Sequence, residues 1–257
     1  SPRFAGQLLG FELELFSLCE YRPIYWYLDH LITLRLQLFE HAQESAAAQN
    51  VAANDAAVAG AAAKKGKKGK PQKKVVAPIP PPVMLELLML QAMRELTRGM
   101  TLLLSALGKL GMLPAVDAEF TPLATRFERR FLPFAQLLRP TPLRWADYTH
   151  VMGVQIDACP LLEVLASAER FFKACKASVD KAIKHEAATP ATKAECTAQA
   201  RVAVANTIFI ASAGLAAMEP PHDADANAAA ARSTPKRPRV EFNFGSHKHF
   251  PAAVLRS

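Results

Sequence analysis

Residues 60–68 contain the first pattern that could support chemistry, because they resemble a phosphate-binding loop. Such a loop needs two glycines at a fixed spacing, followed by a lysine and by a serine or threonine that binds magnesium. Gly60 and Gly66 are one residue too far apart, and Lys68 stands where the hydroxyl must be. The pattern therefore does not predict a nucleotide site.

Two pairs of residues near the ends of the chain have the right types for metal binding or acid–base work. His247 and His249 could share a metal ion in an extended segment, but no cysteine or carboxylate cluster accompanies them, which favours a packed or solvent-exposed pair. Glu12 and Glu14 are two residues apart, so a helix would point them to different sides. We interpret these glutamates and Glu20 as salt-bridge or capping partners, although one could line a partner's groove. No complete catalytic set is indicated.

A run of lysines is the clearest physical signal. Seven lysines lie within eleven residues, and their removal would lower the formal net charge from +8 to +1. Positive charges on a flexible tether displace counterions from RNA or DNA phosphates, and the lack of interleaved aromatic residues predicts binding without sequence recognition. A solubilising or targeting tract is the alternative. The candidates for polyanion or ribosome binding are Lys64, Lys65, Lys67, Lys68, Lys70, Lys73 and Lys74.

Length and composition place the chain among globular proteins with a real core. At roughly 150 residues per domain, 257 residues correspond to one or two domains. No two of the four cysteines have C-x-x-C spacing, which favours reduced, partly buried thiols. The longest uncharged run, 202–218, is slightly shorter than the roughly 20 residues that cross a bilayer and contains polar side chains. We interpret it as a buried helix and expect no membrane contact.

The elements that must position these residues are helices. Hydrophobic periodicity predicts an all-α fold: a helical scaffold with a disordered Ala/Lys-rich insertion and an extended C-terminal tail. No alternating strand pairs or hairpin turns are indicated. The predicted segments are a helical segment at 1–45, a disordered Ala-, Lys- and Pro-rich loop at 46–82, a helical body at 83–218, a flexible linker at 219–239 and a docked C-terminal tail at 240–257.

Prolines should set several helix boundaries. Pro23 cannot donate a backbone hydrogen bond and disfavours helical angles in the preceding residue. A first helix should therefore stop near Tyr21, and a second should run over residues 24–44. Pro190 suits the first position of a helix. The other expected helices lie at 83–107, 145–154, 160–186 and 191–218.

Two aromatic residues of the second helix allow two interpretations. Trp26 and Tyr27 could anchor a partner, since buried aromatic residues dominate interface energetics, or they could pack in the chain's own core, which we favour. In the helix at 83–107 the spacing also predicts interior side chains. These are Leu87, Leu90, Arg94 and Leu96.

Four blocks form the most specific pattern. The first contains Gly10-Phe11-Glu12-Leu13-Glu14-Leu15-Phe16, then Glu20-Tyr21, then Ile24-Tyr25-Trp26-Tyr27-Leu28. The others are Phe127-Glu128-Arg129-Arg130-Phe131-Leu132-Pro133-Phe134 followed by Pro140-Thr141-Pro142, then Ala166-Ser167 through Phe172-Lys173-Ala174, and finally Glu241-Phe242-Asn243-Phe244-Gly245-Ser246-His247-Lys248-His249-Phe250-Pro251. In this order the blocks resemble the large auxiliary subunit of the N-terminal acetyltransferase C (NatC) complex. That family also carries a lysine-rich loop between the first two blocks.

The resemblance implies that certain residues serve in packing or in an interface. The sequence also departs from the family pattern at some positions. Pro23 falls where the family usually has an aromatic residue, and the alanine tract at 46–63 looks like a lineage-specific expansion. The family's N-terminal half is absent, so we expect a C-terminal portion. The selected residues are Phe11, Glu12, Glu14, Glu20, Tyr21, Tyr25, Trp26, Tyr27, Arg130, Phe131, Pro133, Phe134, Phe242, Phe244, His247, Phe250 and Pro251.

The resemblance implies a non-catalytic scaffold in the cytoplasm. In the family's complex a GNAT-type catalytic subunit and a small Sm-like subunit join the helical subunit, and the complex acetylates nascent chains that begin with Met and a bulky hydrophobic residue. It implies that acetyl-CoA binds the catalytic partner and that this chain needs no cofactor. We further expect the lysine loop to contact ribosomal RNA.

Two other classes of function compete with this interpretation. An enzyme with its own site would need an acetyl-CoA loop, and the nearest run, Gln7-x-x-Gly10-x-Glu12, puts a carboxylate where that loop needs a small residue. A generic helical repeat adaptor with a polyanion-binding lysine loop should show a fixed period of roughly 30 to 45 residues. We detect no such period.

Overall fold

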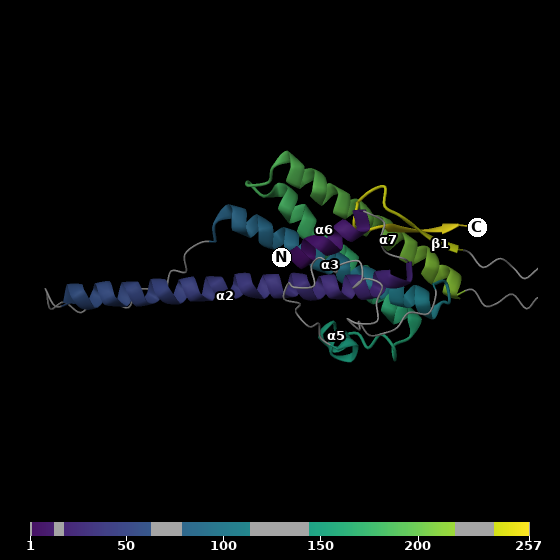
Figure 1. The fold of residues 1–257 in the computed structure, drawn as a ribbon, viewed down its shortest axis with the longest axis horizontal. Coiled ribbons are helices and arrows are strands. Elements are labelled where there is room, and N and C mark those ends of the chain that lie inside the picture. Colours follow the sequence, from purple (N-terminus) through teal and green to yellow (C-terminus); the bar gives the residue numbers. More distant parts are fainter. Residues whose placement is uncertain (1, 13–17, 63–78, 114–143, 219–238, 257) are drawn as a thin grey trace, which may run out of the picture.

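The computed structural model describes residues 2–12, 18–62, 79–113, 144–218 and 239–256. The described part consists of helices and one two-stranded sheet (Figure 1). The predicted all-α class is therefore confirmed. The elements are α1 (Pro2–Glu12), the 3-10 turn η1 (Leu18–Glu20), α2 (Tyr21–Ala62), α3 (Pro81–Lys109), α5 (Trp145–Val151), α6 (Leu161–Lys184), α7 (Pro190–Met218), β1 (Arg239–Asn243) and β2 (Ala252–Arg256).

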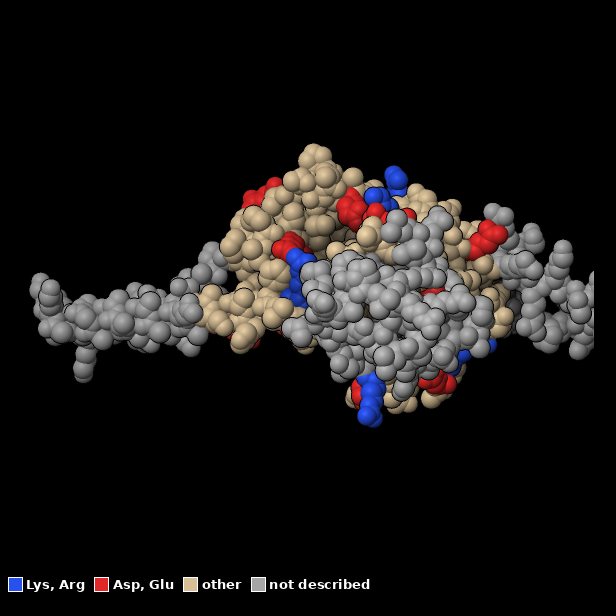
Figure 2. Space-filling view, in the orientation of Figure 1, with Lys and Arg blue, Asp and Glu red and all other residues tan. Residues whose placement is uncertain are grey.

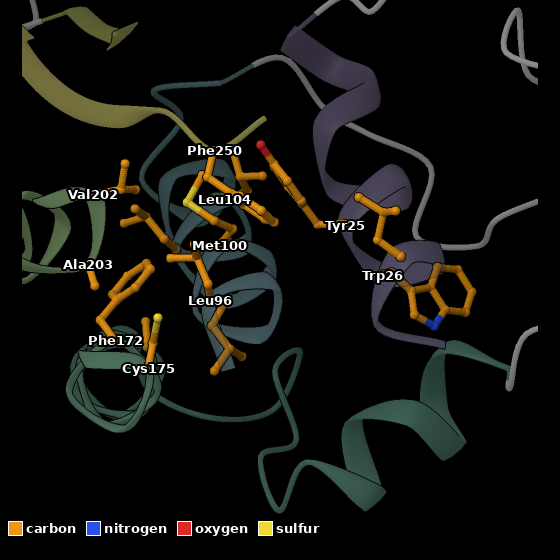
Figure 3. Close-up of a cluster of buried hydrophobic side chains, with 14 of the residues drawn as sticks. Tyr25, Trp26, Leu96, Met100, Leu104, Phe172, Cys175, Val202, Ala203 and Phe250 are labelled. Carbon is orange, nitrogen blue, oxygen red and sulfur yellow. The ribbon is translucent and has the colours of Figure 1, made fainter. Parts of the chain in front are cut away.

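Helix α3 is the centre of the fold. It packs against α2, α6 and α7, while α7 also packs along α6 (Figure 1). Its residues from Leu102 to Leu107 are almost completely buried, because neighbouring helices surround this part of α3. Figure 3 shows Phe172 and Cys175 of α6 facing Leu96 and Met100 of α3. Within the described residues, no helix is long and apolar enough to cross a membrane.

A glycine allows α3 and α6 to approach closely. A Cβ atom placed on Gly99 would lie only 2.7 Å from a ring carbon of Phe172. Phe172 is fully buried, so its ring has little space in which to move. The contact between these helices thus depends on the missing side chain of Gly99.

Prolines and glycine mark helix ends largely as predicted. Pro81 and Pro82 occupy the first turn of α3, and Pro190 is the first residue of α7, where a missing N–H loses no helical bond. At the other end of α3, Gly111 adopts a positive φ of 66°, and the amide of Met112 bonds to the carbonyl of Leu107. This arrangement satisfies carbonyl groups that the helix end would leave unpaired.

The break between the first two helices lies earlier in the chain than predicted. The sequence predicts a first helix up to Tyr21, but α1 ends at Glu12 and α2 already begins at Tyr21. Pro23 consequently sits in the first turn of α2 and does not separate two helices. Proline is tolerated there because the first N–H groups of a helix have no intrahelical partner.

The prediction of disorder is wrong for residues 46–62. These residues continue α2, which extends away from the helical body in Figure 1. Alanine has the highest helix propensity of all residues, so a helix that has already started can continue through an alanine tract without burial. Residues 63–78, including the seven lysines, lie outside the described residues, as do 114–143 and 219–238.

The C-terminal tail is extended and docked, but it also pairs with itself. Strands β1 and β2 are antiparallel, with Val240 opposite Leu255 and Phe242 opposite Ala253. Strand β2 contacts α7. The sequence predicts no strand pairing here, because the two strands are short and eight residues separate them, so the usual two-residue hairpin turn is missing.

Candidate interaction site

The first and last sequence blocks meet in one cluster of aromatic rings, which we call the terminal junction. Tyr25 stacks between Phe11 and Phe250, with ring centroids 5.2 and 5.4 Å away. Tyr21 makes edge contacts with Phe242 and Phe244, both at 6.0 Å. Each well-placed aromatic pair adds about 0.5–1.5 kcal/mol beyond its burial. The terminal junction comprises Phe11, Tyr21, Tyr25, Phe242, Phe244 and Phe250.

Hydrogen bonds reinforce the terminal junction. The Tyr25 hydroxyl donates to the backbone carbonyl of His249 at 2.7 Å. The Nε2 atom of the same histidine lies 2.8 Å from the Glu12 carboxylate, and Lys248 Nζ lies 3.9 Å from it. The interpretation of Glu12 as a salt-bridge partner is confirmed. The hydrogen bond from His249 lowers the pKa of Glu12, whereas burial lowers the pKa of His249 itself.

His247 ties the tail to α7. Its Nδ1 accepts the backbone N–H of His249 at 3.0 Å, so the proton of a neutral ring lies on Nε2 and is donated to Glu195 at 2.9 Å. The His247 ring is buried, and the hydrogen bond to it lowers the pKa of Glu195. The two histidines therefore bind different carboxylates.

Asn206 of α7 forms a second attachment for the tail. Its side-chain NH2 donates to the carbonyl of Pro251 at 3.1 Å, and its side-chain oxygen accepts the amide of Ala253 at 2.8 Å. Asn206 is fully buried, and both backbone groups lie in buried residues. One side chain thus satisfies two main-chain groups of the hairpin.

A buried ion pair joins α2 to α3. Arg98 Nε donates to both carboxylate oxygens of Asp29, at 3.0 and 3.2 Å. Asp29 is only 2% exposed, and burial raises its pKa to about 6 despite the attraction of Arg98. Helix α5 packs beside this pair, where Trp145 meets Trp26 edge-on with a 5.4 Å centroid distance.

Comparison with known proteins identifies the family. A family model described as NAA35-like with TPR repeats matches residues 7–253, which is nearly the whole chain. The chain belongs to the NAA35-like family. A curated relative from Drosophila melanogaster, named N-alpha-acetyltransferase 35, NatC auxiliary subunit homolog, is 32% identical over 149 residues. The resemblance to the NatC auxiliary subunit is thereby confirmed. These residues are 55% of this chain and 18% of the relative, so the chain spans less than a fifth of that relative's length.

The described helices start at unequal intervals. In this NAA35-like chain, α6 starts 80 residues after α3, and α7 starts 29 residues after α6. Such unequal spacing gives no fixed period in the sequence.

The structure buries several of the family-signature residues, and others lie outside the described residues. Trp26 and Tyr27 are 2% and 1% exposed, so both are buried within the chain. Pro251, which directly precedes β2, is buried, and Glu20 ends the turn before α2. Five signature residues lie outside the described ranges: Glu14, Arg130, Phe131, Pro133 and Phe134.

Three residues that position these segments were missed in the sequence. Asp29 follows Tyr25 by four residues on an otherwise apolar helical face, and this lone carboxylate was an available signal. Asn206 was visible only as a polar residue in an apolar run. Glu195 carried no local signal, because its partner is 52 residues away.

The described residues contain no group of three or more His, Cys, Asp or Glu residues that could hold a metal ion. Burial raises the pKa of the Cys175 thiol to about 12, so the reactive thiolate is not populated near neutral pH. Gln7, Gly10 and Glu12 lie in helix α1 and not in a loop that could surround a pyrophosphate.

Proposed function

We propose that this chain acts as a non-catalytic part of a NatC-type N-terminal acetyltransferase, in which it holds a GNAT-type catalytic subunit and a small Sm-like subunit. Membership of the NAA35-like family and the similarity to a Drosophila protein named as a NatC auxiliary subunit homologue support this role. The observation that carries the proposal is the terminal junction. There, the family's most specific blocks join the two ends of the chain. Their aromatic rings stack on each other, and their histidines bind nearby carboxylates.

The chemistry of the described residues supports assigning acetyl-CoA to the partner. A GNAT subunit holds the pyrophosphate with the backbone amides of a loop, whereas the nearest matching run here is helical and ends at Glu12. That carboxylate would repel phosphate and already binds His249. The complex would acetylate N-termini in which Met is followed by a hydrophobic residue.

The lysine run supports a location at the ribosome in the cytoplasm. On the face shown in Figure 2, the charged side chains of the described residues form small separate groups of both signs. The concentrated positive charge instead lies in the run from Lys64 to Lys74. A weak, salt-sensitive contact with ribosomal RNA would raise the local concentration of the enzyme without holding it permanently.

Reconstitution tests the auxiliary role. The chain, the GNAT-type subunit and the Sm-like subunit are co-expressed, and acetylation of a Met-Leu peptide is measured with each component omitted. We expect the chain to co-purify with the catalytic subunit and to show no turnover alone. Turnover or acetyl-CoA binding by the isolated chain would overturn the proposal. Co-purification with unrelated proteins only would favour a generic helical adaptor.

A salt series tests the ribosome contact separately. Replacing the seven lysines with glutamine should release the chain from ribosomes at lower salt in co-sedimentation, because fewer counterions are displaced on binding. An unchanged profile would refute the RNA contact and leave the auxiliary role intact.

A further inference from the structure

Two histidines of the C-terminal tail bind carboxylates on two different helices. His249 Nε2 lies 2.8 Å from Glu12 Oε1 on α1, and His247 Nε2 lies 2.9 Å from Glu195 Oε1 on α7. A neutral imidazole carries one proton, and an ionised carboxylate can only accept. Each neutral ring therefore carries its proton on Nε2 and donates it to the carboxylate.

A second proton would have to enter each ring at Nδ1, where it would find no acceptor. The Nδ1 of His247 accepts the backbone N–H of His249 at 3.0 Å, so a proton there would set two donors against each other. The Nδ1 of His249 is buried from solvent and has no hydrogen-bond partner among the described residues. Because a buried donor without an acceptor is unfavourable, the closed junction favours two neutral rings.

The two carboxylates attract a positive ring, but water weakens this attraction. The side chains of Glu12 and Glu195 are 37% and 45% exposed, whereas those of His249 and His247 are only 13% and 2% exposed. Solvent screens the exposed carboxylates, while a buried ring loses hydration that its charged form needs. Burial accordingly lowers the pKa of His249 despite its hydrogen bond to Glu12.

The other charged and titratable groups around the two rings do not reverse this preference. The ring centroids of His247 and His249 lie 5.4 Å apart, so a proton on one ring opposes a proton on the other. Lys248 Nζ lies 3.9 Å from Glu12 and offsets part of its negative charge. Tyr25 of α2 donates its hydroxyl to the backbone carbonyl of His249, and burial raises its pKa, so this group stays neutral.

An open tail would not restrict the protons in this way. A histidine exposed to water has a pKa of about 6.5, so the open tail takes up protons below that pH, whereas the closed tail resists them. The form that binds more protons gains population as the pH falls. The closed junction is consequently favoured above about pH 6.5 and becomes less stable as the pH falls below this value.

We propose that the terminal junction is a pH-sensitive switch, which releases the C-terminal tail from α1 and α7 when His247 and His249 take up protons. Release would uncover the ring of Tyr25, on which Phe250 stacks in the closed form (Figure 3). The molecule would then present an exposed aromatic surface. The proposal is independent of the acetyltransferase role, because it rests on the hydrogen bonds of the two rings.

Hydrogen exchange of the full chain tests this proposal. The amide of Ala253 in β2 bonds to a side chain of α7, so its exchange rate, divided by the intrinsic rate at each pH, measures the opening of the tail. The variants are His247→Gln/His249→Gln and, as a matched control, His150→Gln, which removes an exposed histidine on α5. A local measurement is needed because Asp29 changes the global stability in the opposite direction.

We expect the opening of the wild-type tail to increase between pH 7 and 5.5 by up to about eightfold for each histidine, or roughly 70-fold for both, if the protons enter only the open form. His150→Gln should retain this increase. The double variant should lose it, and each single variant should keep about eightfold.

Nitrogen NMR of the wild-type rings gives a second measurement that does not depend on any variant. Both rings should remain neutral with the proton on Nε2 at pH 6 in the closed form. Titration of either ring near pH 6.5 while the tail stays closed would overturn the proposal. An opening of the wild-type tail that does not change with pH, or an increase that the double variant retains, would overturn it as well.

Discussion

Replacing Asn206 with alanine should detach the C-terminal hairpin from α7. The substitution removes two hydrogen bonds and leaves the carbonyl of Pro251 and the amide of Ala253 without a partner. Each buried group left unpaired costs about 1–3 kcal/mol, which gives roughly 2–6 kcal/mol in total. We expect about 3 kcal/mol, because an opened hairpin lets water reach both groups. This is a large share of a typical stability of about 5–15 kcal/mol.

Thr207→Ala provides a matched control on the next residue. Its hydroxyl donates to the carbonyl of Ala203 in the same helix, and within the described part of the chain it makes no hydrogen bond to the hairpin. We expect a change below about 0.5 kcal/mol for this half-exposed position. Urea denaturation gives the free energy of unfolding of both variants and the wild type. Hydrogen exchange at the amide of Ala253 measures local opening, and it should accelerate only in Asn206→Ala.

The reasoning would be refuted by a particular pair of results. If Asn206→Ala unfolds at the same urea concentration as Thr207→Ala, the two hydrogen bonds do not stabilise the fold. If the Ala253 amide also keeps its protection, the aromatic contacts of the terminal junction hold the hairpin without help from α7.

Three further changes test other parts of the fold. Gly99→Ala should destabilise it by about 1–3 kcal/mol, since the new Cβ meets Phe172, whereas Gly108→Ala, where nothing lies within 4 Å, should stabilise it by up to about 1 kcal/mol; denaturation midpoints that move together would contradict this. Burial raises the pKa of Asp29 from 3.8 to about 6, so the folded state binds this proton more tightly than the unfolded state does. The free energy of unfolding should therefore fall by up to about 3 kcal/mol as pH rises from about 4 to 6, and Asp29→Asn, measured over the same pH range, should lack this component. Tyr27→Ala should lower the melting temperature of the chain alone, at a cost of about 3–5 kcal/mol, because the ring is buried; weaker partner binding with unchanged melting would show an interface role.

The helices could be predicted because their signals are local. For the helix at 160–186 the structure has α6 at Leu161–Lys184, and for that at 191–218 it has α7 at Pro190–Met218. Apolar spacing and proline positions carry this information within a few residues. The predicted interior positions are only partly right: Leu90 and Leu96 are buried, whereas Leu87 and Arg94 are only partly buried.

The errors came from features that local patterns do not determine. Residues 46–62 look too poor in bulky side chains for a folded segment, yet alanine needs no burial to continue a helix. The β1–β2 pair packs on another part of the fold, because β2 contacts α7. The Asp29–Arg98 pair joins residues 69 positions apart, so one sequence gives no indication that they meet.

The terminal junction changes where a binding surface should be sought. Residues of a family signature are usually the first to be mutated in a search for an interface. Here, however, Tyr25 stacks between Phe11 and Phe250, and all three side chains are buried within the chain. Changing them would alter the fold first and partner binding only as a consequence. Side chains that touch little of their own chain are better candidates for a partner. On α7, Ile208 is such a side chain, because it is 61% exposed. It belongs to no signature block, so a search guided by the signature alone would miss it.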